Sequence, residues 1–165
     1  MNPYALGSAW FVNSYKVVEN ADEEITSLYN FDPATSAIVD DNFLDQLDGF
    51  QGDIDTSGYI NLTSYHPNKL VYEAKTSTRQ MAVFSEIYYP RGWQAYIDGE
   101  PAGHFRVNYV LRAMIIPEGE HTITFEFKPD AYYTGRKVSI ASSALLIILL
   151  LASLAIEGRK ALKKE

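Results

Sequence analysis

The residues that could carry catalysis are few in this sequence and do not form a known catalytic set. Three histidines, at positions 66, 104 and 121, lie far apart and outside any zinc-binding H-E-x-x-H spacing. The absence of cysteine excludes disulfides, thiol nucleophiles and zinc–thiolate sites. No serine lies in a G-x-S-x-G turn, and neither a P-loop nor a G-x-G-x-x-G motif is present. We therefore expect no catalytic residue and no cofactor within this chain.

An acidic loop is the one segment that resembles a metal site. Residues 53–58 read Asp-Ile-Asp-Thr-Ser-Gly, which resembles the start of a calcium-binding loop. The segment lacks the glutamate that closes such a loop at its twelfth position, where Ser64 stands. We expect a solvated acidic loop and no metal.

Aromatic residues give a clearer functional signal, because four of them cluster around one predicted turn. Tyr88, Tyr89, Trp93 and Tyr96 surround the turn Pro90-Arg91-Gly92. Exposed flat rings that combine an apolar face with a polar group suit amphipathic ligands, including the faces of sugars. The same rings could instead pack in the core and at the edges of a sheet. We take these four residues as the candidates for carbohydrate contact.

Residues 58–128 show the pattern of a small antiparallel β-sandwich. Ile123, Phe125 and Phe127 alternate with polar residues, which predicts a strand with one buried face and one solvated face. Turn sequences such as Asp98-Gly99 divide the segment at the short intervals typical of a sandwich. The predicted strands are residues 59–65, 69–75, 79–89, 93–97, 106–116 and 121–128.

Residues 1–57 predict a mixed α/β segment. Asn20 stands where it can cap a short helix, with Glu23 in the capping-box position and Ile25 and Leu28 on one face. We expect this segment to pack on a sandwich formed by residues 58–137. Its predicted strands are residues 9–12, 15–18 and 35–39, followed by a helical turn at residues 42–47.

The charge distribution argues against nucleic acid as a partner. The formal net charge is -7, and residues 1–60 contain eleven acidic residues and a single basic one, Lys16. Binding to a phosphate backbone depends on clustered Lys and Arg, which this part of the chain lacks.

The C-terminal region predicts a membrane-spanning helix. Residues 138–156 contain no charged side chain. At about 1.5 Å per residue they extend about 28 Å, close to the thickness of the hydrocarbon core of a bilayer. A helix that is apolar on all sides needs lipid or a large protein around it. We expect residues 138–156 to cross the membrane, with residues 157–165 as a basic tail.

Charges on either side of this helix predict its orientation. Arg136 and Lys137 precede it, whereas Arg159, Lys160, Lys163 and Lys164 follow it. The positive-inside rule then places the tail in the cytoplasm and the domain outside it. Residues 1–30 contain no signal peptide. We expect the C-terminal piece of a longer membrane protein, the alternative being a tail-anchored protein with its domain inside.

Several motifs of this sequence resemble the C-terminal end of the YfhO family. They are the segment 84–99 (FSEIYYPRGWQAYIDG), the segment 106–113 (RVNYVLRA), the turn 117–121 (PEGEH), and, near the start, NPYALG at residues 2–7. The resemblance covers nearly the whole chain. It implies a bacterial multi-pass membrane protein similar to GT-C glycosyltransferases, which transfer sugars from polyprenyl-phosphate carriers to envelope polymers. The acidic catalytic residue of such proteins lies in an early loop outside this region, so none is assigned here.

The resemblance, the aromatic cluster and the membrane helix together give three functional hypotheses. In the first, the chain is the non-catalytic, extracytoplasmic C-terminal module and last membrane helix of a YfhO-like glycosyltransferase. The other two are a membrane-anchored carbohydrate-binding module and a structural anchor for assembly. The expected partners are the lipid bilayer, other transmembrane helices of the parent protein, and an envelope glycopolymer.

Overall fold

The computed structural model describes residues 5–47, 49–53 and 55–162. It divides the chain into two compact units, one ending at Phe127 and one beginning at Lys128. The first unit holds all the described strands, and the second is a helix. Each unit is considered by itself.

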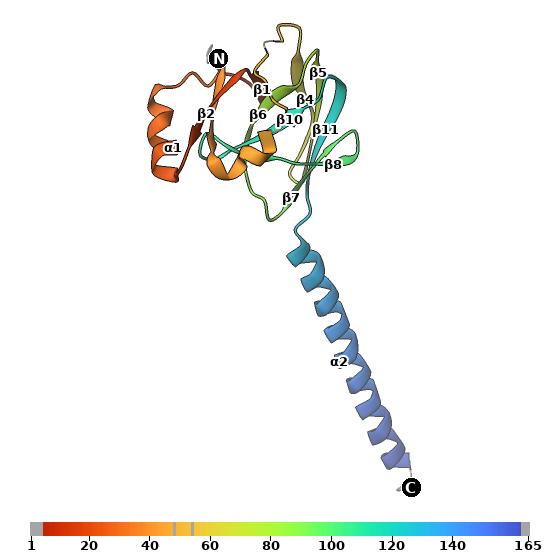
Figure 1. Cartoon of the computed structure of the whole chain (residues 1–165). Helices are drawn as coiled ribbons and strands as arrows, with labels where there is room; N and C mark the ends of the chain where they lie inside the picture. The colour runs from red at the N-terminus through yellow and green to blue at the C-terminus, as the bar shows by residue number, and fades with distance from the viewer. Residues whose placement is uncertain (1–4, 48, 54, 163–165) are drawn as a thin grey trace. The chain divides into compact units, whose positions relative to one another are not determined.

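The larger sheet of the first unit has six strands drawn from distant parts of the sequence. All neighbours in it are antiparallel except β2 and β3, which run parallel. The first 57 residues contribute three strands to this sheet (Figure 1). In spatial order the strands are β1 (Ala9–Val12), β6 (Gln80–Ile87), β10 (Leu111–Ile116), β9 (Phe105–Val107), β3 (Ser36–Asp40) and β2 (Ser14–Val18).

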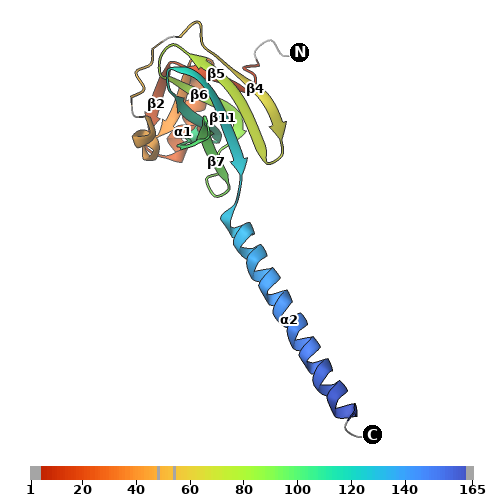
Figure 2. The same cartoon turned by 90° about the vertical axis from the view of Figure 1, so that its right-hand side faces the viewer.

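The smaller sheet has five strands and is antiparallel throughout. Strands of this sheet lie side by side in Figure 2. Each pair is joined in a continuous register, apart from one irregularity between Leu62 and Ser64 in its first strand. In spatial order the strands are β4 (Tyr59–His66), β5 (Lys69–Thr76), β11 (Gly119–Phe127), β7 (Trp93–Ile97) and β8 (Glu100–Ala102).

The core between the sheets is built by strand alternation. Ile123 and Phe125 of β11 are fully buried, whereas Thr122, the residue before Ile123 in the same strand, is exposed. Three rings, Tyr72, Phe84 and Phe125, meet edge to face with centroids 4.9 to 6.1 Å apart. Such contacts between aromatic edges and faces add to the free energy gained from burial. The fold class predicted from the sequence is therefore confirmed.

The six-stranded sheet is also buried on its second face. Val39, Val83 and Val107 lie there in a second apolar cluster with Leu47 and Phe43. The last two residues belong to the 3-10 helix η2 (Asp41–Leu47). Because both faces are covered, β6 reads as a continuous buried run from Gln80 to Phe84 and not as an alternating strand.

One strand prediction was wrong. Residues 106–116 form two antiparallel strands, β9 and β10, joined by a tight turn. Asn108 and Tyr109 both have positive φ, 51° and 72°, which ends the extended conformation between the strands. The short strand β8 after the Asp98-Gly99 turn was also not predicted.

The short helix α1 (Ala21–Ser27) is capped as predicted. The Asn20 side-chain oxygen accepts a hydrogen bond from the Glu23 amide at 2.9 Å. The Glu23 carboxylate accepts in return from the amide of Glu19, one residue before the expected position. The predicted apolar face is not what the helix buries, because Ile25 is 43% exposed and Glu24 is fully buried.

The second unit is one long helix, α2 (Asp130–Leu162). It begins eight residues before the apolar stretch that was predicted to span the membrane. Among the described residues, it is the one helix long and apolar enough to cross a membrane, over Asp130–Ile156. Its large apolar side chains, from Val138 to Ile156, are exposed in the structure. A helix with this surface needs an apolar environment around it.

Candidate functional site

Strand alternation separates the aromatic residues that were predicted to contact carbohydrate. Trp93 lies in β7 on the side facing the sandwich core, and it packs against Phe127 with ring centroids 5.4 Å apart. Tyr96, three residues later in the same strand, lies on the opposite face. Its hydroxyl donates a hydrogen bond to the Gln94 side chain at 2.7 Å. The two rings therefore do not form one platform.

The two tyrosines before the turn also differ from each other. Tyr88 is half-buried and makes edge contacts with Phe43 at 5.7 Å and with His104 at 5.4 Å. Tyr89 is 49% exposed. Of the four candidates, Tyr89 is exposed, whereas Tyr88, Trp93 and Tyr96 are half-buried. Carbohydrate contact by these residues stays a prediction.

A buried arginine lies beneath Trp93, and sequence reasoning did not identify it. Arg112 is 1% exposed, and its guanidinium carbon lies 4.7 Å from the Trp93 centroid and 4.4 Å from the Phe125 centroid. One of its nitrogens, Nη2, donates to the Ile87 carbonyl at 3.1 Å. Its Nε and Nη1 atoms have no hydrogen-bond partner. Two aromatic faces thus contact the guanidinium, and burial lowers the pKa of Arg112 although the negative charge of Glu86 acts in the opposite direction.

Gly92, the residue before Trp93, helps to fix the position of Trp93 over Arg112. Gly92 is buried against the ring of Phe127, and a Cβ at this position would overlap that ring. Glycine is needed here because the backbone approaches a side chain so closely. Gly92 and Trp93, which lie in the segment predicted to contact carbohydrate, thus have a structural role in closing one end of the sandwich core.

The histidines occupy three different environments. His66 ends β4 and is exposed. His104 is partly buried between Tyr88 and Phe125. His121 contacts the Asp98 carboxylate at 2.6 Å. Among the residues that the structure describes, no three His, Cys, Asp or Glu side chains converge as metal ligands.

His104 and His121 should give opposite pH dependences of stability. Burial and the charge of Arg112 lower the pKa of His104 to about 4, so the unfolded chain takes up a proton below about pH 6.5 that the folded chain does not. Folding stability from His104 is therefore lost as the pH falls from 6.5 towards 4. The hydrogen bond to Asp98 raises the pKa of His121, so its contribution is present below pH 6.5 and is lost as the pH rises through the raised value.

The two effects can be separated by substitution. In a His121→Gln background, the free energy of unfolding should fall by about 2 kcal/mol between pH 6.5 and pH 4.5, and His104→Phe should remove most of that fall. Thermal unfolding of the full chain in micelles, followed by circular dichroism at several pH values, measures both. Equal slopes with and without His104 would contradict the assignment.

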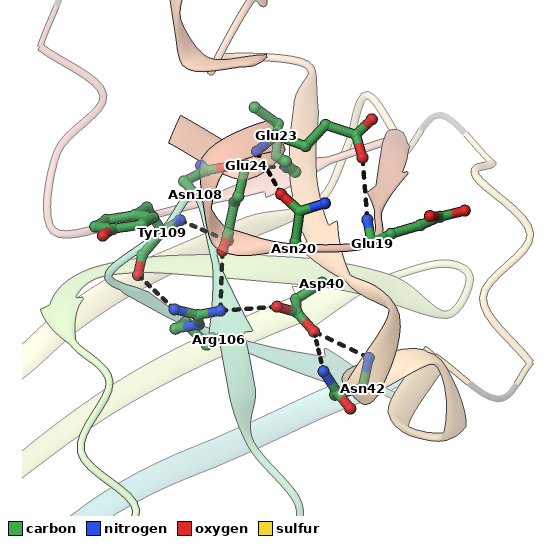
Figure 3. A network of polar contacts seen from close by, with 10 residues as sticks. Glu19, Asn20, Glu23, Glu24, Asp40, Asn42, Arg106, Asn108 and Tyr109 are labelled. Atoms are coloured by element: carbon green, nitrogen blue, oxygen red, sulfur yellow. Dashed lines mark hydrogen bonds and ion pairs between the residues drawn. The ribbon is translucent and has the colours of Figure 1, made fainter. Parts of the chain in front are cut away.

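A network of two carboxylates and one arginine lies in the first unit (Figure 3). Arg106 Nη2 lies 2.9 Å from Glu24 Oε2 and 3.1 Å from Asp40 Oδ2. The contact with Glu24 is an ion pair without hydrogen-bond geometry, whereas the contact with Asp40 is a hydrogen bond. Glu24 comes from α1, Asp40 from β3 and Arg106 from β9. The network therefore joins three elements that are distant in sequence.

The network also holds the turn between β9 and β10. The Tyr109 amide donates to Glu24 Oε1 at 2.8 Å, and the Tyr109 carbonyl accepts from Arg106 Nη1 at 3.2 Å. Asn108 exchanges two hydrogen bonds with the backbone of Ile38, each 2.8 Å long. Two consecutive non-glycine residues with positive φ are strained, so these contacts stabilise a conformation that the residues would otherwise disfavour.

Electrostatics of the network fit a structural role. Burial raises the pKa of Glu24, although the Tyr109 hydrogen bond and the charge of Arg106 act in the opposite direction. Burial would also raise the pKa of Asp40, but hydrogen bonds from Asn42 and the charge of Arg106 lower it. Each carboxylate thus has a dedicated partner within the fold, and we assign the network to positioning α1 and the turn.

Comparison with known proteins agrees with the architecture. The family model described as "Bacterial membrane protein YfhO" matches residues 45–139, which is more than half of the chain. This segment runs from η2 through the five-stranded sheet, β6, β9 and β10 and into α2. No curated protein and no solved structure matches the chain significantly. The chain belongs to the YfhO family of bacterial membrane proteins.

Proposed function

We propose that this chain is the extracytoplasmic C-terminal module and last membrane helix of a lipid-carrier-dependent glycosyltransferase that modifies cell-envelope glycopolymers. The observation that carries the proposal is the YfhO match, which includes the whole five-stranded sheet, three strands of the six-stranded sheet and the start of the apolar helix α2. The module's role is non-catalytic: it positions the acceptor polymer or braces the membrane-embedded part.

The proposed sidedness rests on the charges around the helix. Four basic residues follow the apolar stretch and two immediately precede it. The chain has no cysteine, so single cysteines can report which side is accessible. Glu100→Cys lies in the exposed strand β8, and Lys164→Cys lies in the tail.

Labelling of intact bacteria with a membrane-impermeant maleimide tests the orientation. In a parent protein without other cysteines, Glu100→Cys should react in intact cells, and Lys164→Cys should react only after permeabilisation. The reverse pattern would place the module in the cytoplasm and remove the proposed role.

Deletion of the module tests the function itself. In cells that express the parent protein, removal of residues 5–127 with the helix retained should abolish glycosylation of the envelope polymer. Immunoblotting of the membrane fraction controls for insertion. Unchanged glycosylation with normal insertion would refute the proposal.

A further inference from the structure

A groove with both polar and apolar lining residues lies between α1 and the edge of the six-stranded sheet. Its volume is about 310 Å³, and its lining comes from α1, β2, β3 and the segment between α1 and β3. Lys16, one of the lining residues, lies in β2, which is an edge strand of the sheet. Every residue of the lining precedes residue 45, so the groove is outside the segment that the family model matches. The lining includes Lys16, Glu23, Ser27, Asn30, Phe31 and Ser36.

Contacts across the groove hold its walls in place. Lys16 Nζ donates to Ser27 Oγ at 2.8 Å and lies 3.9 Å from the Glu23 carboxylate. The side chain of Lys16 therefore links β2 to α1. The chain between α1 and β3 is fixed by Trp10, whose indole donates to the Pro33 carbonyl at 2.8 Å, and by Asp32, which caps the turn before Ser36. These contacts preform the groove without filling it.

The lining has the chemistry of a hydroxyl-rich ligand site. It offers an ammonium, a carboxylate, an amide and hydroxyls as hydrogen-bonding groups, together with the half-buried ring of Phe31 and the buried side chain of Ile38. Pockets for small ligands have volumes of about 300–1,000 Å³ and combine apolar surface with a few polar groups.

Charge limits the class of ligand. Glu19, Asp22 and Glu23 lie on or next to α1, and Lys16 is the one basic residue in the first 60. Because Lys16 is already paired with Glu23, an anionic ligand would meet net repulsion. A neutral ligand, or one with amino groups, would not.

We propose that this groove binds a neutral or amino-bearing sugar unit of an envelope polysaccharide. The inference rests on the proposed function, because it names the site at which the module would hold the acceptor polymer. It also assigns carbohydrate recognition to this groove and not to the surface around Trp93. Asn30 and Ser27 supply hydrogen bonds to hydroxyls, Phe31 supplies the apolar contact, and Lys16 with Glu23 closes one end.

Saturation-transfer NMR and calorimetry on the full chain test the proposal. The chain is placed in lipid nanodiscs, because many detergents carry sugar head groups. The probes are chitotetraose, its de-acetylated amino form, and tetragalacturonate as an anionic sugar of equal length. We expect the first two to bind and the anionic one to bind at least tenfold more weakly. Binding of none of the three, or tightest binding of tetragalacturonate, would overturn the proposal.

Substitutions locate the binding. Asn30→Ala and Lys16→Met, both at exposed positions, should weaken binding by about five- to tenfold, as expected for the loss of one hydrogen bond. Tyr59→Ala is the matched control, because Tyr59 is an exposed ring on β4 in the other sheet. Unchanged circular dichroism shows that each variant is folded. Equal affinity in Asn30→Ala and wild type, or a loss in Tyr59→Ala alone, would place the site elsewhere.

The module deletion and the binding measurement together separate this inference from the proposed function. If module deletion abolishes glycosylation in cells but the chain binds no neutral or amino sugar in vitro, the groove is wrong and the module's role stands. If the groove binds sugar but module deletion leaves glycosylation unchanged, the binding site stands and the role in the transferase is wrong.

Discussion

Replacing Arg106 with methionine is expected to lower the free energy of unfolding by about 3–5 kcal/mol, the usual cost of removing one partner of a buried ion pair. Glu24 is fully buried and Asp40 is 6% exposed, so both carboxylates would lose their common cation inside the fold. The Tyr109 carbonyl would also lose its hydrogen bond from Arg106. Denaturant unfolding of the full chain in micelles measures the loss.

The pH dependence of this loss identifies its cause. Burial already raises the pKa of Glu24, and removal of Arg106 would raise it further. A raised carboxyl pKa favours folding below the unfolded value of 4.5 and disfavours it as the pH rises through the folded value. The difference between wild type and Arg106→Met should therefore shrink as the pH falls towards 4.5.

Two further variants serve as controls. Adding Glu24→Gln to Arg106→Met should recover part of the loss, because an amide oxygen still accepts from Tyr109 and needs no counterion. Lys16→Met removes an exposed ion pair and should cost less than about 1 kcal/mol. A loss in Arg106→Met as small as that in Lys16→Met would show that the network contributes little.

The elements with a local physical cause were predictable from the sequence. Ile123, Phe125 and Phe127 alternate with polar residues over the whole of β11, so the pattern alone fixes which face is buried. Asn20 caps α1 because its side chain can satisfy a free amide three residues later, which needs no tertiary contact. The membrane-spanning character of α2 was predictable in the same way, because it depends only on the length and apolar composition of one continuous stretch.

Elements set by distant partners could not be predicted in this way. On α1, apolar spacing favoured Ile25 as the buried residue, yet Glu24 is buried because Arg106 and the Tyr109 amide meet its carboxylate. The turn at Asn108 and Tyr109 interrupts a segment that reads as one strand. Tyrosine rarely adopts positive φ, and here the conformation depends on contacts to Glu24 and Ile38.

The candidate site shows a limit of a different kind. Tyr88, Tyr89, Trp93 and Tyr96 are close in sequence, and we interpreted closeness as a shared surface. The period of two in a strand already separates Trp93 from Tyr96, so this part of the arrangement could have been predicted. The stacking of Arg112 beneath Trp93 could not, because it joins strands of different sheets.

Trp93→Ala is expected to lower the free energy of unfolding by about 3–4 kcal/mol, as for other large aromatic side chains truncated in a core. The substitution removes the ring contact with Phe127 and uncovers one face of the Arg112 guanidinium. Trp93→Phe keeps a ring over Arg112 and should cost about half as much. Unfolding is followed by circular dichroism, because the variants change the tryptophan fluorescence.

The partner substitution should behave differently. Arg112→Met replaces a buried charge that has one hydrogen bond by an apolar chain of similar length, which removes the desolvation cost of the charge but also its interaction with Glu86. We expect stability within about 1.5 kcal/mol of wild type. In the double variant, the cost of Trp93→Ala should fall by about 1–2 kcal/mol, which is the coupling expected for a desolvated cation–π pair.

The coupling decides what Trp93 does in this molecule. If the two substitutions are coupled, the indole face is already used by Arg112, and the ring has one face fewer to offer to a sugar. Loss of carbohydrate binding in Trp93→Ala would then report loss of structure, which Trp93→Phe would restore. Additive effects would instead free the ring from this structural role and favour Trp93, over the α1 groove, as the place where the module meets its polymer.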